Sequence, residues 1–123
     1  MTKANALHRF FSSFGMTAYA AASVPEDADF PYLTYDLITG AWGGGEVGLS
    51  VNLWFYTTSE DGPNAKAEEL SQAIGLGGKI VPCDGGYIWL KRGSPWCQSL
   101  RDEACPTIKR RYINVTAEYL TAS

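Results

Sequence analysis

Residues 40–56 read GAWGGGEVGLSVNLWFY, and the second half of this stretch indicates the fold. From Val47 to Tyr56, apolar side chains alternate with Gly, polar and aromatic ones, and Val47, Leu49, Val51, Leu53 and Phe55 share one side. A period of two is the pattern of a β-strand that buries one face. The stretch therefore predicts a long, half-buried strand.

The glycines before this strand match a nucleotide-binding fingerprint in spelling only. Gly43, Gly45 and Gly48 stand in the order G-x-G-x-x-G after YLTYDLI (residues 32–38), which also alternates like a strand. A dinucleotide site needs the third glycine to open a helix whose N-terminal amides hold the pyrophosphate. Because Gly48 lies inside a predicted strand, we expect no dinucleotide cofactor and interpret the glycines as a hairpin tip or bulge.

The rest of the chain alternates between helical and strand patterns. A helix is predicted over residues 3 to about 14, and a second within residues 59–78, with Pro63 in its first turn and Gly75 at its end. Asp84-Gly85-Gly86 indicates a hairpin turn. Further strands are predicted around TAYAA (17–21) and at KIVPC (79–83), YIWLKR (87–92), SPWCQSLR (94–101, begun at Pro95) and TIKRRYINVTAEYLT (107–121).

The predicted order is a helix, two or three strands, a second helix and then four strands. This order predicts one α+β domain over residues 1–123. We expect a mostly antiparallel β-sheet with two helices packed on one face. A formal net charge of −3 argues against nonspecific binding to nucleic acid. No apolar run reaches the length of a membrane span, so we expect an intracellular protein without a membrane partner.

Residues that could carry chemistry are few. His8 is the only histidine and lies on an amphipathic helix, which favours a surface position. Cys83, Cys97 and Cys105 form no C-x-x-C pair, and we expect three reduced, buried thiols. We therefore expect no catalytic residue, no metal and no cofactor.

Two surface features stand out. Trp54 and Tyr56 lie on the outward side of the long strand, as do Tyr87 and Trp89 on the hairpin strand, which suggests a partner unless the protein's own elements cover both sheet faces. The run Lys109-Arg110-Arg111 is either a solvated edge that discourages strand pairing or the counterpart of an acidic patch on a neighbouring subunit. The acidic loop is SVPEDADFP (residues 23–31), and its PEDAD segment (residues 25–29) is a candidate for that patch.

Five segments in this order, FPYLTYDL, VGLSVNLWFY, AKAEELSQAIG, RGSPWCQ and KRRYINVTAEYL, span most of the chain. Together they are similar to the small tail-terminator and tail-completion proteins of long-tailed bacteriophages and prophages. The resemblance implies a virion structural protein without enzymatic residues, which forms a ring, typically a hexamer, on the finished tail tube. It also implies contacts with the major tail tube protein and the head–tail connector or neck, and a lumen through which DNA passes without specific binding.

The localisation implied is the virion tail, and the host cytoplasm during assembly. The family's interface residues follow no motif, so our candidates come from the surface patterns above: Trp42, Gly44, Glu46, Trp54, Tyr56, Trp89, Lys109, Arg110 and Arg111. We expect the glycine loop with Trp42 to be poorly ordered in an isolated subunit. The alternatives are another head–tail joining or head-closure component and, in a different class, a small ligand-binding domain or enzyme with an aromatic pocket between helix and sheet.

Overall fold

The computed structural model describes residues 1–38, 46–101 and 104–122. Its regular elements are two α-helices, two short 3₁₀ helices and six strands. In chain order they are α1 (Lys3–Phe11), η1 (Ser12–Phe14), β1 (Thr17–Ala20), η2 (Ala21–Ser23), β2 (Tyr32–Tyr35), β3 (Glu46–Tyr56), α2 (Asp61–Ile74), β4 (Lys79–Cys83), β5 (Gly86–Arg101) and β6 (Ile108–Thr121).

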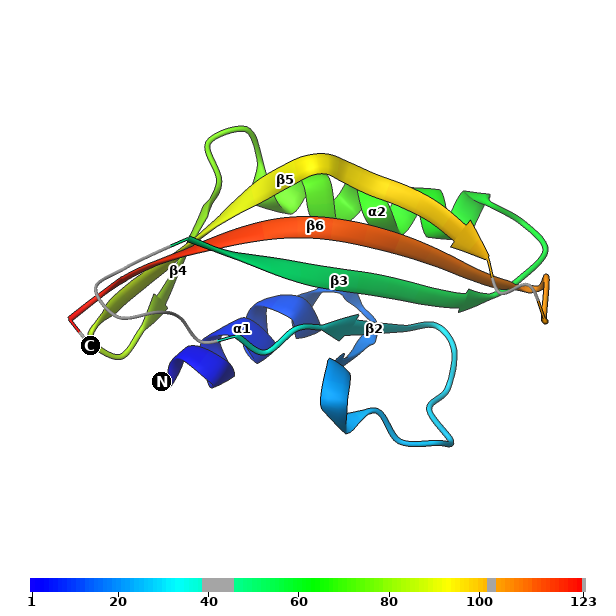
Figure 1. Ribbon diagram of the computed structural model, residues 1–123, viewed down its shortest axis with the longest axis horizontal. Coiled ribbons are helices and arrows are strands. Elements are labelled where there is room, and N and C mark those ends of the chain that lie inside the picture. Colours follow the sequence, from blue (N-terminus) through cyan, green and yellow to red (C-terminus); the bar gives the residue numbers. More distant parts are fainter. Residues whose placement is uncertain (39–45, 102–103, 123) are drawn as a thin grey trace.

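All six strands form one sheet in the order β1-β2-β3-β6-β5-β4. The strands β1 and β2 are parallel, and every other neighbouring pair is antiparallel. The long strands β3, β6 and β5 run side by side along the molecule, with α2 behind β5 and β6 in the view of Figure 1. The predicted α+β class with a mostly antiparallel sheet is confirmed.

Strand β3 follows its sequence pattern. Leu49, Val51 and Leu53 are buried, whereas Tyr56 on the opposite side is 64% exposed. Of the three fingerprint glycines, only Gly48 is among the described residues, and it lies within β3 as predicted. The structure does not describe Trp42, Gly43, Gly44 or Gly45. The expectation that this loop is poorly ordered also concerns residues outside the described ranges.

Both α-helices pack on the sheet face that carries these buried side chains. The Phe11 ring of α1 stacks on Tyr35 of β2, with 4.9 Å between the ring centroids. From α2, Leu70 and Ile74 enter the same core. Thr2 caps α1 by accepting a hydrogen bond from the Asn5 amide. The expected packing of two helices on one face is therefore confirmed, and α1 continues through η1 to Phe14, close to the predicted end.

The described residues of the second half form three strands, not the four that we predicted. The segments YIWLKR and SPWCQSLR belong to one strand, β5, which pairs with β6 on both sides of an irregularity between Arg92 and Cys97. Pro95 lies in this irregularity, where its missing N–H removes no ladder hydrogen bond. Its carbonyl accepts a 2.8 Å hydrogen bond from the Asn114 side chain. The proline therefore marks a bulge and not the start of a strand.

Strand β2 is shorter than the predicted 32–38. It ends at Tyr35, and Leu37 is exposed and not part of an alternating strand. At this point the Ser50 amide donates to the Asp36 carboxylate at 2.9 Å, and the Asp36 amide donates to the Ser50 carbonyl at 3.0 Å. A side-chain oxygen thus replaces a backbone carbonyl in the ladder, which ends the regular pairing.

Candidate assembly surface

The sheet face opposite the helices carries the exposed aromatic residues. Because side chains alternate along a strand, the register that buries Leu53 and Ile113 turns their neighbours to the other side. No described helix packs on this side. We call it the bare face, and along the three long strands it carries Ser50, Asn52, Trp54 and Tyr56 of β3, Arg110, Tyr112, Asn114, Thr116 and Glu118 of β6, and Tyr87, Trp89 and Lys91 of β5.

One end of the bare face holds five aromatic rings, which we call the Trp54 cluster: Tyr19, Phe30, Tyr32, Trp54 and Tyr56. Tyr32 stacks on Trp54 with 6.1 Å between centroids, and Phe30 lies 5.2 Å from Tyr32 and 5.9 Å from Tyr56. The indole N–H of Trp54 donates to Thr34 at 3.1 Å, which fixes the ring on the sheet. Tyr56 and Phe30 stay exposed at its rim.

Arg110 joins the Trp54 cluster to the middle of the face. Its guanidinium carbon lies 5.2 Å from the Trp54 ring centroid and 5.9 Å from that of Tyr112. The buried Nε of Arg110 and the buried Oδ1 of Asn52 have no hydrogen-bond partner among the described residues. Unpaired buried polar groups are costly, so a partner that draws these side chains into hydrogen bonds would gain free energy.

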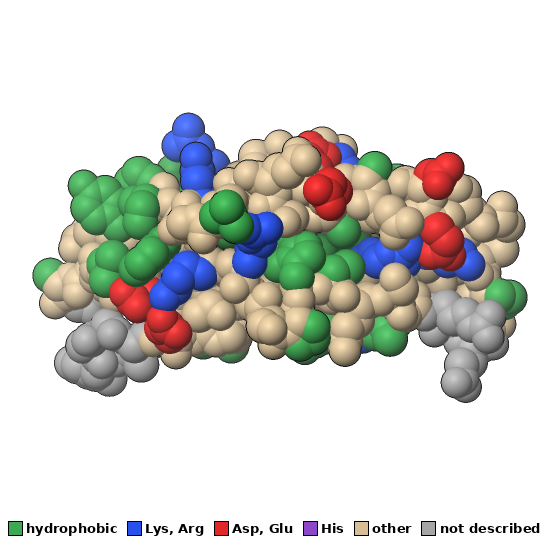
Figure 2. Space-filling view, turned by 90° about the horizontal axis from the view of Figure 1, so that it is seen from above, with side chains coloured by type: hydrophobic (Ala, Val, Ile, Leu, Met, Phe, Trp, Pro, Cys, Tyr) green, Lys and Arg blue, Asp and Glu red, His purple; other side chains and the backbone are tan. Residues whose placement is uncertain are grey.

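The other end carries a second apolar group, the hairpin patch: Ile80, Tyr87, Trp89 and Leu120. Tyr87 pairs with Leu120, and Ile80 pairs with Trp89. Ile80, Tyr87 and Leu120 are exposed, whereas Trp89 is half-buried. The Trp89 indole N–H donates to the Gly77 carbonyl at 2.9 Å. Figure 2 shows hydrophobic side chains gathered at its left end, where the β4–β5 hairpin lies in Figure 1.

Glu46, a predicted interface residue, lies beside the hairpin patch and not among the aromatic rings of the Trp54 cluster. It forms an ion pair with Lys91, whose ammonium also lies 3.5 Å from Glu118 and 4.4 Å from the Trp89 ring centroid. The hydrogen bond from Lys91 holds the pKa of Glu46 below its usual range, and the same bond raises the pKa of Lys91. These charges rim the patch, as polar groups commonly rim an interface.

The basic run is divided between the two sheet faces, and its position corrects the interpretation of the run as a solvated sheet edge. Strand β6 is central, so the run is not an edge that discourages pairing. Arg111 is only 2% exposed and donates to Glu60 at 2.6 Å and to Asn64 at 2.8 Å. The Lys109 ammonium lies 3.3 Å from the same Glu60. Because Lys109 and Arg111 are paired within the chain, only Arg110 faces outward for a neighbouring subunit.

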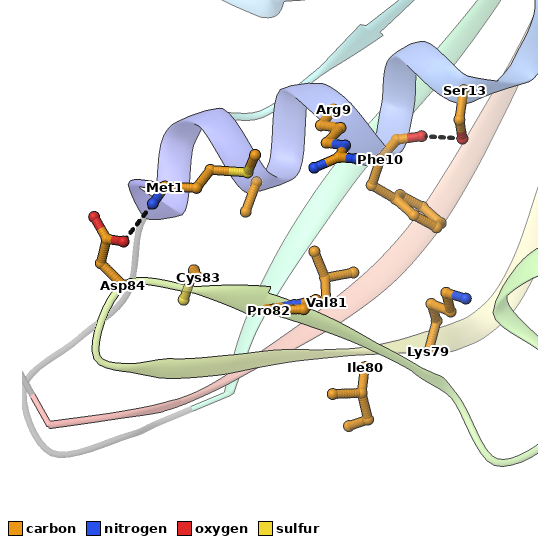
Figure 3. Close-up of a pocket in the computed structure, with 11 residues that line it drawn as sticks. Met1, Arg9, Phe10, Ser13, Lys79, Ile80, Val81, Pro82, Cys83 and Asp84 are labelled. Carbon is orange, nitrogen blue, oxygen red and sulfur yellow. Dashed lines mark hydrogen bonds and ion pairs between the residues drawn. The ribbon is translucent and has the colours of Figure 1, made fainter.

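A groove of about 640 Å³ lies between α1 and the edge strand β4 (Figure 3). Ala6 and Phe10 line it from α1, and Val81 lines it from β4. Arg9 on α1 and Lys79 on β4 lie on its two sides. Sequence patterns did not identify this groove, because it depends on which strand ends the sheet beside α1.

His8 is exposed, as predicted, with hydrogen bonds of 3.2 Å to Tyr35 and 3.3 Å to Ser12. The three cysteines are free and half-buried, and burial raises the pKa of the Cys97 thiol. Within the described ranges, no three His, Cys, Asp or Glu side chains gather in a way that could hold a metal ion. No described helix has the length and apolar character that crossing a membrane requires.

No protein-family model, curated protein or solved structure matches this chain.

Proposed function

We propose that the protein is a structural subunit of a phage tail, a tail terminator that forms a ring on the tail tube and joins it to the neck. The observation that carries this proposal is the bare face. Among the described residues, both α-helices pack on one side of the sheet, and the other side displays the Trp54 cluster and the hairpin patch. Exposed aromatic groups with a charged rim are typical of surfaces that bind another protein.

The sequence resemblance supplies the phage context, and the bare face supports it physically. In this proposal the bare face contacts the next structural protein of the virion, the tail tube or the neck. The location is the virion tail, and DNA passes through the ring without specific binding. A net charge of −3 suits such a passage, because a basic channel would bind the DNA.

Two measurements test the proposal. The mass of the purified protein is determined by light scattering over a range of concentrations, and the same samples are imaged in negative stain. Sedimentation with polymerised tail tubes then measures binding to the tube. We expect a ring of defined diameter, at least in the presence of tubes, and co-sedimentation with them. A protein that stays monomeric at every concentration and does not bind tubes would contradict the proposal.

Another head–tail joining component remains the alternative within this class. It predicts that the protein binds the head's connector and not the tail tube, so antibody labelling of purified virions separates the two roles. The ligand-binding or enzyme alternative predicts an enclosed cavity lined by aromatic side chains. The groove between α1 and β4 is open, and Phe10 is the one aromatic residue among its described lining residues. We therefore prefer the assembly role.

A further inference from the structure

Two oppositely charged features, whose charged side chains form no ion pair with a described residue, lie at opposite edges of the sheet. The acidic loop, residues 23–31, connects β1 to β2 at one edge, and the α1–β4 groove lies at the other. In Figure 1 the acidic loop (blue to cyan) and β4 (yellow-green) also lie toward opposite sides of the view. The acidic loop of one molecule therefore does not reach the groove of the same molecule.

The acidic loop is available for a contact. Glu26, Asp27 and Asp29 are exposed, and none of them forms an ion pair with a described residue. Phe30 at the end of the loop is 37% exposed and adds an apolar side chain next to the carboxylates. Three like charges in so short a segment repel one another, and a cationic partner relieves that repulsion.

The α1–β4 groove has the complementary character. Its floor is apolar, with Phe10 and Val81 among the lining residues. Arg9 and Lys79 are exposed at its sides, and neither forms an ion pair with a described residue (Figure 3). At its far end the terminal ammonium of Met1 and the Asp84 carboxylate neutralise each other. The net charge offered by the groove is therefore positive.

The groove is better suited to a loop than to an added strand. An unpaired edge strand can accept a strand from another chain, but only through its free backbone groups. The fourth of the five residues of β4 is Pro82, which has no N–H to donate. Side-chain contacts between carboxylates and Arg9 or Lys79 do not depend on this missing donor.

We propose that the acidic loop of one copy docks in the α1–β4 groove of the next copy, with Glu26, Asp27 and Asp29 facing Arg9 and Lys79. The proposal rests on the proposed ring function and names its lateral contact. The contact is head-to-tail, because it joins one sheet edge of a molecule to the other edge of its neighbour. Such a contact closes into a ring when the rotation between neighbours fits. It leaves most of the bare face free for the tube or the neck, because only Phe30 of the Trp54 cluster and Ile80 of the hairpin patch adjoin the contact.

Charge reversal on each side separately tests the pairing. The groove variant carries Arg9→Glu and Lys79→Glu, and the loop variant carries Glu26→Lys, Asp27→Lys and Asp29→Lys. Each variant alone presents like charges at the contact, so we expect its self-association to weaken roughly tenfold or more relative to the wild type. In a 1:1 mixture every acidic groove meets a basic loop and every basic groove an acidic loop. We therefore expect the mixture to form rings again.

Light scattering measures the mass of each assembly, and negative-stain imaging shows whether rings form. Circular dichroism checks that each variant folds. Arg9 stands in the last turn of α1, where a carboxylate opposes the helix dipole. Arg9→Gln with Lys79→Gln is therefore measured as a milder groove variant, for which we expect weaker assembly without repulsion. Glu68→Lys, an exposed position on α2 away from both features, is the matched control and should assemble like the wild type.

The outcomes separate this contact from the ring function itself. If the wild type forms rings and either reversal variant does so equally well, the loop–groove contact is wrong and the ring function stands. If both variants are folded monomers and their mixture stays monomeric, the pairing is also wrong. If the wild type neither assembles nor binds tubes, the proposed function fails first. Ring formation only in the wild type and the mixture supports the contact.

Discussion

Arg111 of β6 donates a 2.6 Å hydrogen bond to Glu60, the residue that precedes α2. The pair ties the N-terminus of the helix to the central strand of the sheet, and Asn64 in the first turn of α2 accepts two further bonds from the same guanidinium, at 2.8 and 3.2 Å. The sheet therefore orients α2 through a buried cation as well as through apolar packing.

Glu60→Gln should make the free energy of unfolding less dependent on pH in the acidic range. The hydrogen bonds from Arg111 and Lys109 lower the pKa of Glu60 in the folded protein, and Arg111 has the larger effect. The ionised form therefore stabilises the fold above the ordinary carboxylate pKa, and this stability is lost as pH falls through the lowered pKa. We expect Glu60→Gln to unfold at lower urea than the wild type at pH 7, with the difference shrinking as the solution is acidified. Glu68→Gln is the control, and an equal loss there would contradict the role of Arg111.

Leu70→Ala should destabilise the protein by about 2–5 kcal/mol, because it leaves a cavity where α2 meets the sheet. The Leu70 side chain is fully buried. The matched control is Leu76→Ala, since Leu76 in the turn after α2 is 98% exposed and should change the free energy of unfolding by less than about 0.5 kcal/mol. Urea unfolding monitored by tryptophan fluorescence measures both. Similar losses at the two positions would contradict the packing described.

Gly86→Ala should destabilise the β4–β5 hairpin by about 1–3 kcal/mol. The Gly86 φ of 155° is one that side chains rarely adopt, and an added Cβ would lie 2.0 Å from the Leu120 carbonyl oxygen. Gly48→Ala is the control, because nothing lies within 4 Å of a Cβ at that position in β3. Thermal unfolding compares the two, and we expect a lower midpoint for Gly86→Ala alone. An unchanged midpoint there would show that the hairpin has room at this position.

Ionisation of Tyr119 should lower the free energy of unfolding at high pH. Burial raises its pKa to about 12, and its hydroxyl donates to the Ile38 carbonyl. Because the pKa is higher in the folded state, the neutral phenol stabilises the fold below the ordinary tyrosine pKa of about 10, and this stability is lost as pH rises toward the folded value. Tyr119→Phe should cost about 1 kcal/mol at pH 7 for the lost hydrogen bond. Above pH 10 the free energy of unfolding should fall less in Tyr119→Phe than in the wild type. Urea unfolding across that pH range measures the difference, and Tyr56→Phe at an exposed position is the control.

Polar substitutions on the bare face should leave the stability of the monomer unchanged but weaken its binding to a partner. Tyr56 and Tyr87 are 64% and 52% exposed at its two ends. We expect the double variant Tyr56→Ser, Tyr87→Ser to keep its thermal midpoint within a few degrees and to bind tail tubes or connector about tenfold more weakly. Leu76→Ser, at an even more exposed apolar position outside the strands, is the control. Unchanged binding by the double variant would exclude the ends of this face from the interface.

Local sequence signals determined the elements themselves. The alternation from Val47 to Tyr56 specifies β3, because a period of two in side-chain polarity can bury one face only in a strand. Gly75 ends α2 and Asp84-Gly85 forms the hairpin turn, and each of these depends on backbone freedom within a few residues. The aromatic side of β3 was predictable in the same way.

Only the tertiary structure decided how these elements combine. The central place of β6 turns Lys109 and Arg111 toward Glu60 and Arg110 toward Trp54, which no pattern within the run reveals. Pro95 marks a bulge because β6 pairs with β5 on both sides of it. The α1–β4 groove exists because β4 ends the sheet beside α1. Strand order and register depend on packing between residues far apart in the chain, and that free energy is not encoded in any short segment.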